Sequence, residues 1–210
     1  MASPTPNPLL LVHGIHDTGH KFNKLAHYLQ TQGWSTIHCP DLTPNNGDVG
    51  LEQLAQQLVV YVDTHMGHDQ PFDLVGFSMG GLISRYYVQR LGGIRRIQRF
   101  VTISAPHNGT WMGYGRFNPG CIQMRPNSQF LQDLNHDVDQ LAALSFTSLW
   151  TPYDLMILPA HSSDMGVGET RSLPVLTHPG MLNHPKSIAA IATALSKPVI
   201  PEKFVNSLSL

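Results

Sequence analysis

Residues 72–82 read FDLVGFSMGGL, a short apolar run that leads into Gly-x-Ser-x-Gly and then into an apolar helical pattern. A strand, a sharp turn and a helix in this order place Ser78 on a strained turn, with its hydroxyl clear of the sheet. Gly76 and Gly80 leave room for the neighbouring strand and helix. The helix start also presents free N–H groups beside the hydroxyl. We interpret Ser78 as a nucleophile that attacks a carbonyl, and the alternative is a plain glycine turn.

The composition places the chain among globular proteins of one domain, residues 1–210. Charged residues make up only 13% of the chain, and the net charge is −1. Because there is no basic block, the sequence argues against nucleic acid and against electrostatic docking to anionic lipid. The two cysteines are Cys39, in an apolar stretch, and Cys121, in an expected loop. We expect free thiols, with a disulfide between them as the alternative.

The N-terminal residues and the length of the apolar runs indicate where in the cell the protein is expected. Residues 1–8 carry neither a basic region nor an apolar region of the kind found in secretory signals. No run approaches the ~18 apolar residues that are needed to cross a bilayer. We therefore expect a cytoplasmic protein with no transmembrane segment. We also expect a monomer.

Strand patterns alternate with helix patterns along the whole chain. Strands are expected at residues 9–12, 35–39, 74–77, 97–104, 145–150 and 174–177. Helices are expected around residues 22–29, 51–66, 82–91, 130–134 and 188–195, with irregular loops at 41–50 and 105–126. This alternation predicts an α/β fold whose mostly parallel sheet is covered by helices on both faces. Ligands of such sheets bind at the carboxyl ends of the strands, where the Ser78 turn lies.

A serine nucleophile needs a base, and the base needs a carboxylate that fixes its tautomer. Asp154 follows the strand at 145–150 and sits in the apolar segment TPYDLMILP, residues 151–159. A lone carboxylate in such surroundings is costly unless it is paired. We therefore take Asp154 as the acid, with Asp164 as the alternative. Other acidic residues fall on an expected polar helix face, namely Asp133, Asp137 and Asp139.

Two histidines compete for the role of base, which in this architecture should lie between the last strand and the last helix. His184 stands just before Pro185, after a loop that is long enough to reach over the strand ends. His178 stands one residue beyond the strand expected at 174–177, which puts it close to that strand. We therefore predict His184 as the base and keep His178 as the alternative. The remaining histidines, including His13 and His161, are taken as structural.

The oxyanion and the acyl group need their own contacts. Two backbone N–H donors are expected for the oxyanion, from Met79 and from Ile15, because Gly14 lets the backbone come close. Apolar residues near the site could line an acyl pocket, and their alternative role is ordinary packing. The candidates are Trp111, Met112, Leu155 and Ile157, together with Met156.

These segments together resemble a known family. The matching pieces are LVHGI at 11–15, GFSMGG at 76–81, SAPHNGT at 104–110, Asp154 with its apolar-proline surroundings, and LNHP at 182–185. The chain resembles lipases and esterases of the α/β-hydrolase fold, in particular small bacterial triacylglycerol-lipase-like proteins without a lid. The resemblance implies a single α/β-hydrolase domain that hydrolyses carboxylic esters with no cofactor and no metal. One departure is His16-Asp17, where the family has glycine or small residues.

Three functional hypotheses follow from the sequence. The first is a serine hydrolase for acyl esters with an apolar acyl chain. The low charge of the chain is compatible with contact between such an enzyme and a lipid surface. The second is a thioesterase or acyltransferase that uses the same triad. The third is a binding module that keeps the fold without catalysis, and an intact set of Ser, Asp and His in the expected order argues against it.

Overall fold

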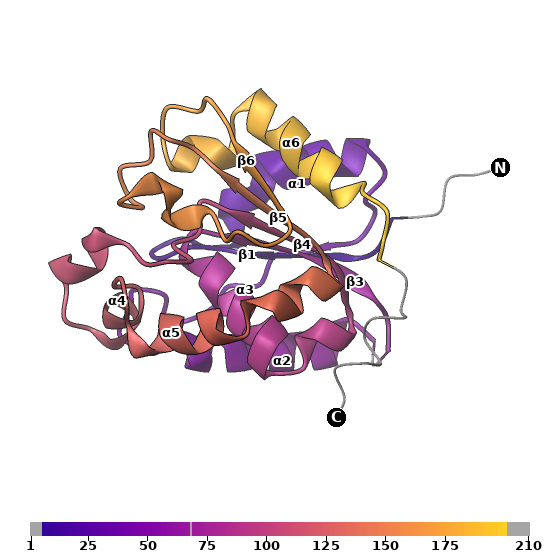
Figure 1. Cartoon of the computed structure of the whole chain (residues 1–210). Coiled ribbons are helices and arrows are strands. Elements are labelled where there is room, and N and C mark those ends of the chain that lie inside the picture. The colour runs from indigo at the N-terminus through magenta and orange to yellow at the C-terminus, as the bar shows by residue number, and fades with distance from the viewer. Residues whose placement is uncertain (1–5, 68, 201–210) are drawn as a thin grey trace.

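A computed structural model describes residues 6–67 and 69–200 and contains one sheet of six strands (Figure 1). The strand order is β2-β1-β3-β4-β5-β6, and every neighbouring pair is parallel. The strands are β1 (Leu9–Val12), β2 (Ile37–His38), β3 (Phe72–Phe77), β4 (Ile97–Ile103), β5 (Ser145–Trp150) and β6 (Glu169–Ser172). Because all strands run the same way, their carboxyl ends share one edge of the sheet.

Helices cover both faces of the sheet. Figure 1 shows α1 and α6 on one face and α2, α3 and α5 on the other. Their bounds are α1 (Asn23–Thr31), α2 (Leu51–His65), α3 (Met79–Arg90), α4 (Pro119–Gln123), α5 (Gln129–His136) and α6 (Pro185–Leu195). The described residues also form short 3₁₀ turns, at Gly19–Phe22, Gly93–Arg95, Trp111–Gly115, Val138–Ala143, Ala160–Ser163 and Pro179–Leu182.

Strand β1 illustrates how the sequence builds this two-sided core. Its four residues are all buried. Leu10 packs among residues of α2 and α3, whereas Leu9 and Leu11 pack among residues of α1 and α6. Successive side chains of a strand point to opposite faces, so a strand with helices on both sides must be apolar throughout. The prediction of a mostly parallel sheet with two covered faces is confirmed.

The last strand differs from the sequence prediction. Residues 174–177 form no strand, and the last strand is β6, with the polar sequence ETRS. This strand pairs only with β5 and is largely exposed, so it needs no apolar run. Val175, which suggested a strand, is buried in an irregular segment that packs on the α6 side of the sheet. His178 therefore lies beyond a connection of five residues, 173–177, and not directly after a strand.

Smaller differences concern the loops and the thiols. The segment 105–126, expected to be an irregular loop, contains the 3₁₀ turn Trp111–Gly115 and helix α4. Strand β2 is shorter than the expected 35–39. Cys39 and Cys121 are both free thiols, so the disulfide alternative is wrong. No helix among the described residues has the length and apolar character needed to cross a membrane.

Candidate active site

Ser78 occupies a sharp turn between β3 and α3. Its backbone has φ 54° and ψ −126°, a conformation that a residue with a side chain adopts only under strain. The turn is held because the Ser78 N–H donates to the carbonyl oxygen of Ile103 at 2.8 Å. A Cβ on Gly76 would stand 2.6 Å from the Cα of Gly81. Strand and helix thus come close enough to lift the serine hydroxyl above the sheet edge.

The acid and a histidine form a buried pair near this turn. The Nδ1 atom of His178 lies 2.7 Å from Oδ2 of Asp154. The other carboxylate oxygen accepts the backbone N–H groups of Met156 at 2.9 Å and Ile157 at 3.0 Å. Burial opposes ionisation of Asp154, but the hydrogen bond and charge of His178, with the two N–H groups, outweigh it, so its pKa lies below the ordinary value.

The orientation of the histidine ring follows from this pair. With Nδ1 directed at Asp154, the Nε2 atom faces the opposite way. The ring packs against Phe77, the residue before Ser78, with their centroids 4.8 Å apart. The residue that precedes Ser78 on strand β3 therefore contacts the ring of His178.

The prediction that His184 pairs with Asp154 is wrong, because His178 occupies that position. His184 is the N-cap of α6, and its Nδ1 atom accepts the Lys186 N–H at 3.2 Å. The physical cause of the error is β6. Its polar edge gave no strand signal, and the misplaced last strand made His178 look too close to the sheet.

The alternative acid, Asp164, forms hydrogen bonds at another place in the fold. Its Oδ1 atom accepts the N–H of Gly166 at 3.0 Å and the hydroxyl of Thr170 at 2.8 Å, and the residue lies near the surface. Asp164 therefore orders the loop that enters β6. Among the described residues, no group of three His, Cys, Asp or Glu side chains is arranged to hold a metal ion.

The turn after β1 comes up against the serine. A Cβ on Gly14 would stand 3.1 Å from the Cβ of Ser78. In the described part of the chain, neither the Ile15 N–H nor the Met79 N–H donates to a protein acceptor. Two free backbone donors thus flank the serine, as an oxyanion site requires.

A buried histidine fixes this turn. The Leu42 N–H donates to Nε2 of His13 at 2.9 Å, so the ring proton is on Nδ1 and donates to the carbonyl of Gly14 at 2.9 Å. Both nitrogens are therefore committed to the backbone. His13 ties the Gly14 turn to the loop at 41–50, in keeping with the structural role expected of it.

Ser78 opens into a cavity of about 290 Å³. Its wall is mainly apolar and includes Met112, Met124, Met156, Ile157 and Cys121. Met112 and Ile157 were predicted to line a pocket, and the structure places both there. Trp111 and Leu155 were also predicted, but they are outside this cavity, with exposed fractions of 61% and 76%.

Thr110 is a residue of this wall that sequence reasoning did not select. Its Oγ1 atom donates to the carbonyl of Met156 at 2.9 Å and accepts the N–H of Leu158 at 3.0 Å. It thereby clamps the segment whose N–H groups hold Asp154. The only sequence signal was its place at the end of the SAPHNGT segment, residues 104–110.

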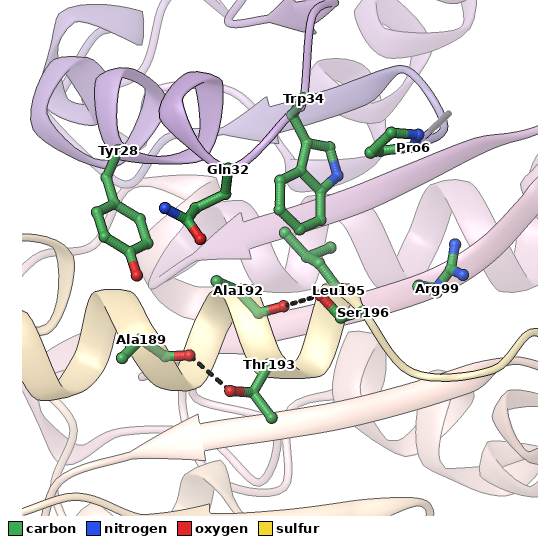
Figure 2. Close-up of a pocket in the computed structure, with 10 residues that line it drawn as sticks. All are labelled: Pro6, Tyr28, Gln32, Trp34, Arg99, Ala189, Ala192, Thr193, Leu195 and Ser196. Carbon is green, nitrogen blue, oxygen red and sulfur yellow. Dashed lines mark hydrogen bonds between the residues drawn. The ribbon is translucent and has the colours of Figure 1, made fainter. Parts of the chain in front are cut away.

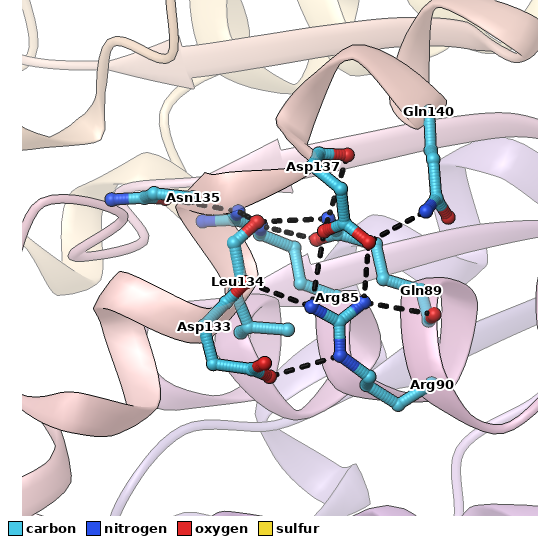
Figure 3. Close-up of polar contacts among 8 residues, drawn as sticks. All are labelled: Arg85, Gln89, Arg90, Asp133, Leu134, Asn135, Asp137 and Gln140. Atoms are coloured by element: carbon cyan, nitrogen blue, oxygen red, sulfur yellow. Dashed lines mark hydrogen bonds and ion pairs between the residues drawn. The ribbon is translucent and has the colours of Figure 1, made fainter.

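The far half of α3 is anchored by polar contacts (Figure 3). Arg85 is fully buried and donates from Nη2 to the Leu134 carbonyl at 2.9 Å. Arg90 forms ion pairs with Asp133 at 2.9 Å and Asp137 at 2.8 Å. These contacts attach α3 to α5 and to Asp137, the residue that follows α5. They fix the position of the helix that Ser78 caps.

A larger hollow of about 650 Å³ lies between α1 and α6 (Figure 2). Figure 2 shows Tyr28, Gln32 and Trp34 on one side and Ala192 with Thr193 on the other. It contains no pairing of a nucleophile with a histidine. We therefore keep the smaller cavity at Ser78 as the candidate site.

Comparison with known proteins assigns the chain to a family. The sequence profile of the family described as palmitoyl protein thioesterase matches residues 8–125, which is more than half of the chain. The chain belongs to the palmitoyl protein thioesterase family. The matched residues of this thioesterase-family chain include Gly14, Ser78 and Thr110 and end before Asp154 and His178.

Solved structures show the fold of this thioesterase-family chain to be that of the α/β-hydrolases. The mature lipase BlEst2 of Bacillus licheniformis superposes with a TM-score of 0.73 at 14% identity, over 93% of this chain and 94% of that one. The product of gene lin2722 of Listeria innocua gives 0.70 at 17% identity, over 92% and 95%. Lipase B of Aspergillus fumigatus gives 0.76 at 18% identity over 93% of this chain, which spans 54% of that lipase.

Proposed function

We propose that the protein is a serine hydrolase that cleaves acyl esters through an acyl-enzyme intermediate. The observation that carries the proposal is the buried pair of His178 and Asp154, 2.7 Å apart, whose histidine ring packs against Phe77, the residue before a serine held at φ 54°. A serine hydroxyl becomes nucleophilic when a base accepts its proton, and the base works best when a carboxylate orients it and stabilises its charged form. Ser78, Asp154 and His178 supply the nucleophile, the acid and the base, and they follow one another along the chain in the order that the fold requires.

The reaction proceeds in two balanced steps. In acylation, Oγ of Ser78 bonds to the carbonyl carbon while Nε2 of His178 accepts the hydroxyl proton and then passes it to the leaving alcohol. In deacylation, His178 takes a proton from water, the hydroxide attacks the acyl carbon, and the proton returns to Oγ. Asp154 keeps the ring proton on Nδ1 in the ground state and stabilises the imidazolium that forms in each step.

The Ile15 and Met79 N–H groups bind the oxyanion in this proposal. Each such preorganised donor contributes about 3 kcal/mol in the transition state. The Gly14 turn is fixed by His13, so the Ile15 donor need not reorganise during the reaction. The apolar cavity with Met112 and Ile157 takes the acyl chain, which favours an apolar acyl group.

A thioester substrate is the second candidate, and the family match is the observation that favours it. The same triad serves both ester classes, because a thiolate leaves more readily than an alkoxide. Comparing 4-nitrophenyl butyrate with butyryl-coenzyme A, with and without an added alcohol, separates hydrolysis of oxygen esters from hydrolysis of thioesters and from acyl transfer.

The test is labelling with a fluorophosphonate, read by intact-mass spectrometry. Wild type should gain one adduct, and Ser78→Ala should gain none. His178→Ala should lose labelling and ester hydrolysis, whereas His184→Ala should retain both, because His184 only caps α6. Full activity in His178→Ala or in Ser78→Ala would refute the proposal.

A further inference from the structure

The cavity at Ser78 is apolar along most of its wall but carries one arginine. Arg116 lies just beyond the 3₁₀ turn Trp111–Gly115 and lines the same cavity as Ser78. Its Nη1 atom is 3.3 Å from Nε2 of His16, the residue after the Ile15 donor. Arg116 thus reaches across the cavity from one wall to the turn that flanks the serine.

Arg116 lacks an ion-pair partner of the kind that Arg90 and Arg99 have. Arg90 and Arg99 form ion pairs with buried or half-buried aspartates. Among the described residues, no carboxylate lies within ion-pair distance of Arg116, and its contact with His16 is to a nitrogen that must be unprotonated to accept. A guanidinium has five N–H donors, so most of them are available to a ligand.

A second arginine strengthens the positive field on this wall. Arg125 donates from Nη2 to the Arg116 carbonyl at 2.9 Å and from Nε to the Gly113 carbonyl at 3.0 Å. Its guanidinium lies over the rings of Tyr114 and Phe117, at 4.7 and 5.2 Å from their centroids. These contacts hold its charge in place beside the cavity without neutralising it.

One carboxylate, that of Asp48, lies near enough to Arg116 to interact with its charge. Asp48 is exposed and accepts hydrogen bonds from the side chains of Asn118 and Asn46. These two bonds are the main cause of its lowered pKa, to which the charges of Arg116 and His16 add. With two guanidiniums against one solvated carboxylate, the wall keeps an excess of positive charge.

We propose that Arg116 is a binding site for an anionic group, a carboxylate or a phosphate, on the substrate of Ser78. This inference rests on the proposed ester hydrolysis. Planar guanidinium groups bind such anions through two parallel N–H donors, and the apolar wall beside Arg116 takes the uncharged part of the same molecule. The anion can belong to the acyl group or to the alcohol, since both meet at the serine.

Two matched substrate pairs test the proposal. The acyl pair is 4-nitrophenyl butyrate and the mono-4-nitrophenyl ester of glutaric acid, and the alcohol pair is phenyl acetate and 4-acetoxybenzoate. The variants are Arg116→Gln and Arg116→Lys. Arg95→Gln is the matched control, because Arg95 is an exposed arginine at the opposite, amino end of the strands.

In at least one pair, Arg116→Gln should lower the ratio of kcat/KM for the anionic over the neutral ester by about two- to fivefold, the upper part of the range expected of an exposed charge pair. Arg116→Lys should keep part of the ratio, and Arg95→Gln all of it. Raising the salt from about 0.05 to about 0.5 M should reduce the wild-type ratio. The pair that responds identifies the part of the substrate that carries the anion.

An unchanged ratio in both pairs for Arg116→Gln would overturn the proposal, while neutral ester hydrolysis by wild type would leave the proposed function standing. Failure of wild type to hydrolyse any of the four esters would instead refute the proposed function. An equal fall in both members of a pair would mean that Arg116 does not distinguish the anionic from the neutral ester, and would also overturn the anion site. Urea unfolding of each variant separates this last result from a loss of folded protein.

Discussion

Replacement of Thr110 by valine should disturb the position of the Asp154 carboxylate without removing the carboxylate. Valine keeps the volume of threonine and loses the hydroxyl, so no cavity forms. The change removes the donor to the Met156 carbonyl and the acceptor of the Leu158 and Met112 N–H groups. The side chain of Thr110 is almost fully buried, so the three backbone groups lose their partner at a buried position.

The cost follows from these three bonds. A hydrogen bond of this kind contributes about 0.5–1.5 kcal/mol, and a buried group left without a partner costs about 1–3 kcal/mol. Since Met156 is partly exposed and can be solvated, we expect a loss of about 1–3 kcal/mol in the free energy of unfolding. Catalysis should suffer more, because the N–H groups of Met156 and Ile157 hold Asp154. A displacement of about 1 Å in a catalytic group can lower kcat about 100-fold.

The assay combines urea unfolding with kcat for 4-nitrophenyl butyrate and the rate of fluorophosphonate labelling. Thr110→Ser should restore both, since it restores the hydroxyl. Thr193→Val is the matched control, because Thr193 is exposed on α6 and its hydroxyl also bonds a backbone carbonyl, that of Ala189, at 2.9 Å. Wild-type kcat in Thr110→Val, at a temperature where the variant is fully folded, would refute the reasoning.

Three further predictions concern the same site. Asp154→Asn should lower kcat about 10⁴-fold with little change in KM, measured by steady-state kinetics, because the amide no longer fixes the tautomer of His178. The free energy of unfolding should fall as the pH drops below about 4, since the pKa of Asp154 is held below its unfolded value; urea titrations from neutral pH to pH 3 should show this fall in wild type and a smaller one in Asp154→Asn. Gly80→Ala should lower the melting temperature by the equivalent of about 1–3 kcal/mol, because its Cβ would collide with the carbonyl oxygens of Val12 and His13; an unchanged melting temperature would contradict the close packing of the turn.

The sequence was informative wherever burial imposed a pattern. The apolar run at 9–12 and the glycines around Ser78 report a strand covered on both faces and a turn that has no space for side chains. Asp154 was recognisable because a carboxylate among apolar residues must find partners, and the structure gives it three.

The histidine could not be placed in the same way. Strand β6 is an exposed edge, so its residues are free to be polar and carry no periodic signal. Without that strand, the distance from the sheet to His178 was misjudged and the choice passed to His184. Thr110 escaped notice for a related reason, since a threonine bonded to the backbone of a distant loop leaves no mark on its own neighbours in sequence.

The separation of the site along the chain has a consequence for its biosynthesis. One hundred residues separate Ser78 from His178. At the ribosome, where chains grow by about 5–20 residues per second, the serine is made about 5–20 s before the histidine. During that interval Ser78 is present without its proton acceptor. A nascent chain that stalls before His178 should therefore remain inert toward fluorophosphonates, and reactivity should arise only when the connection after β6 has been added.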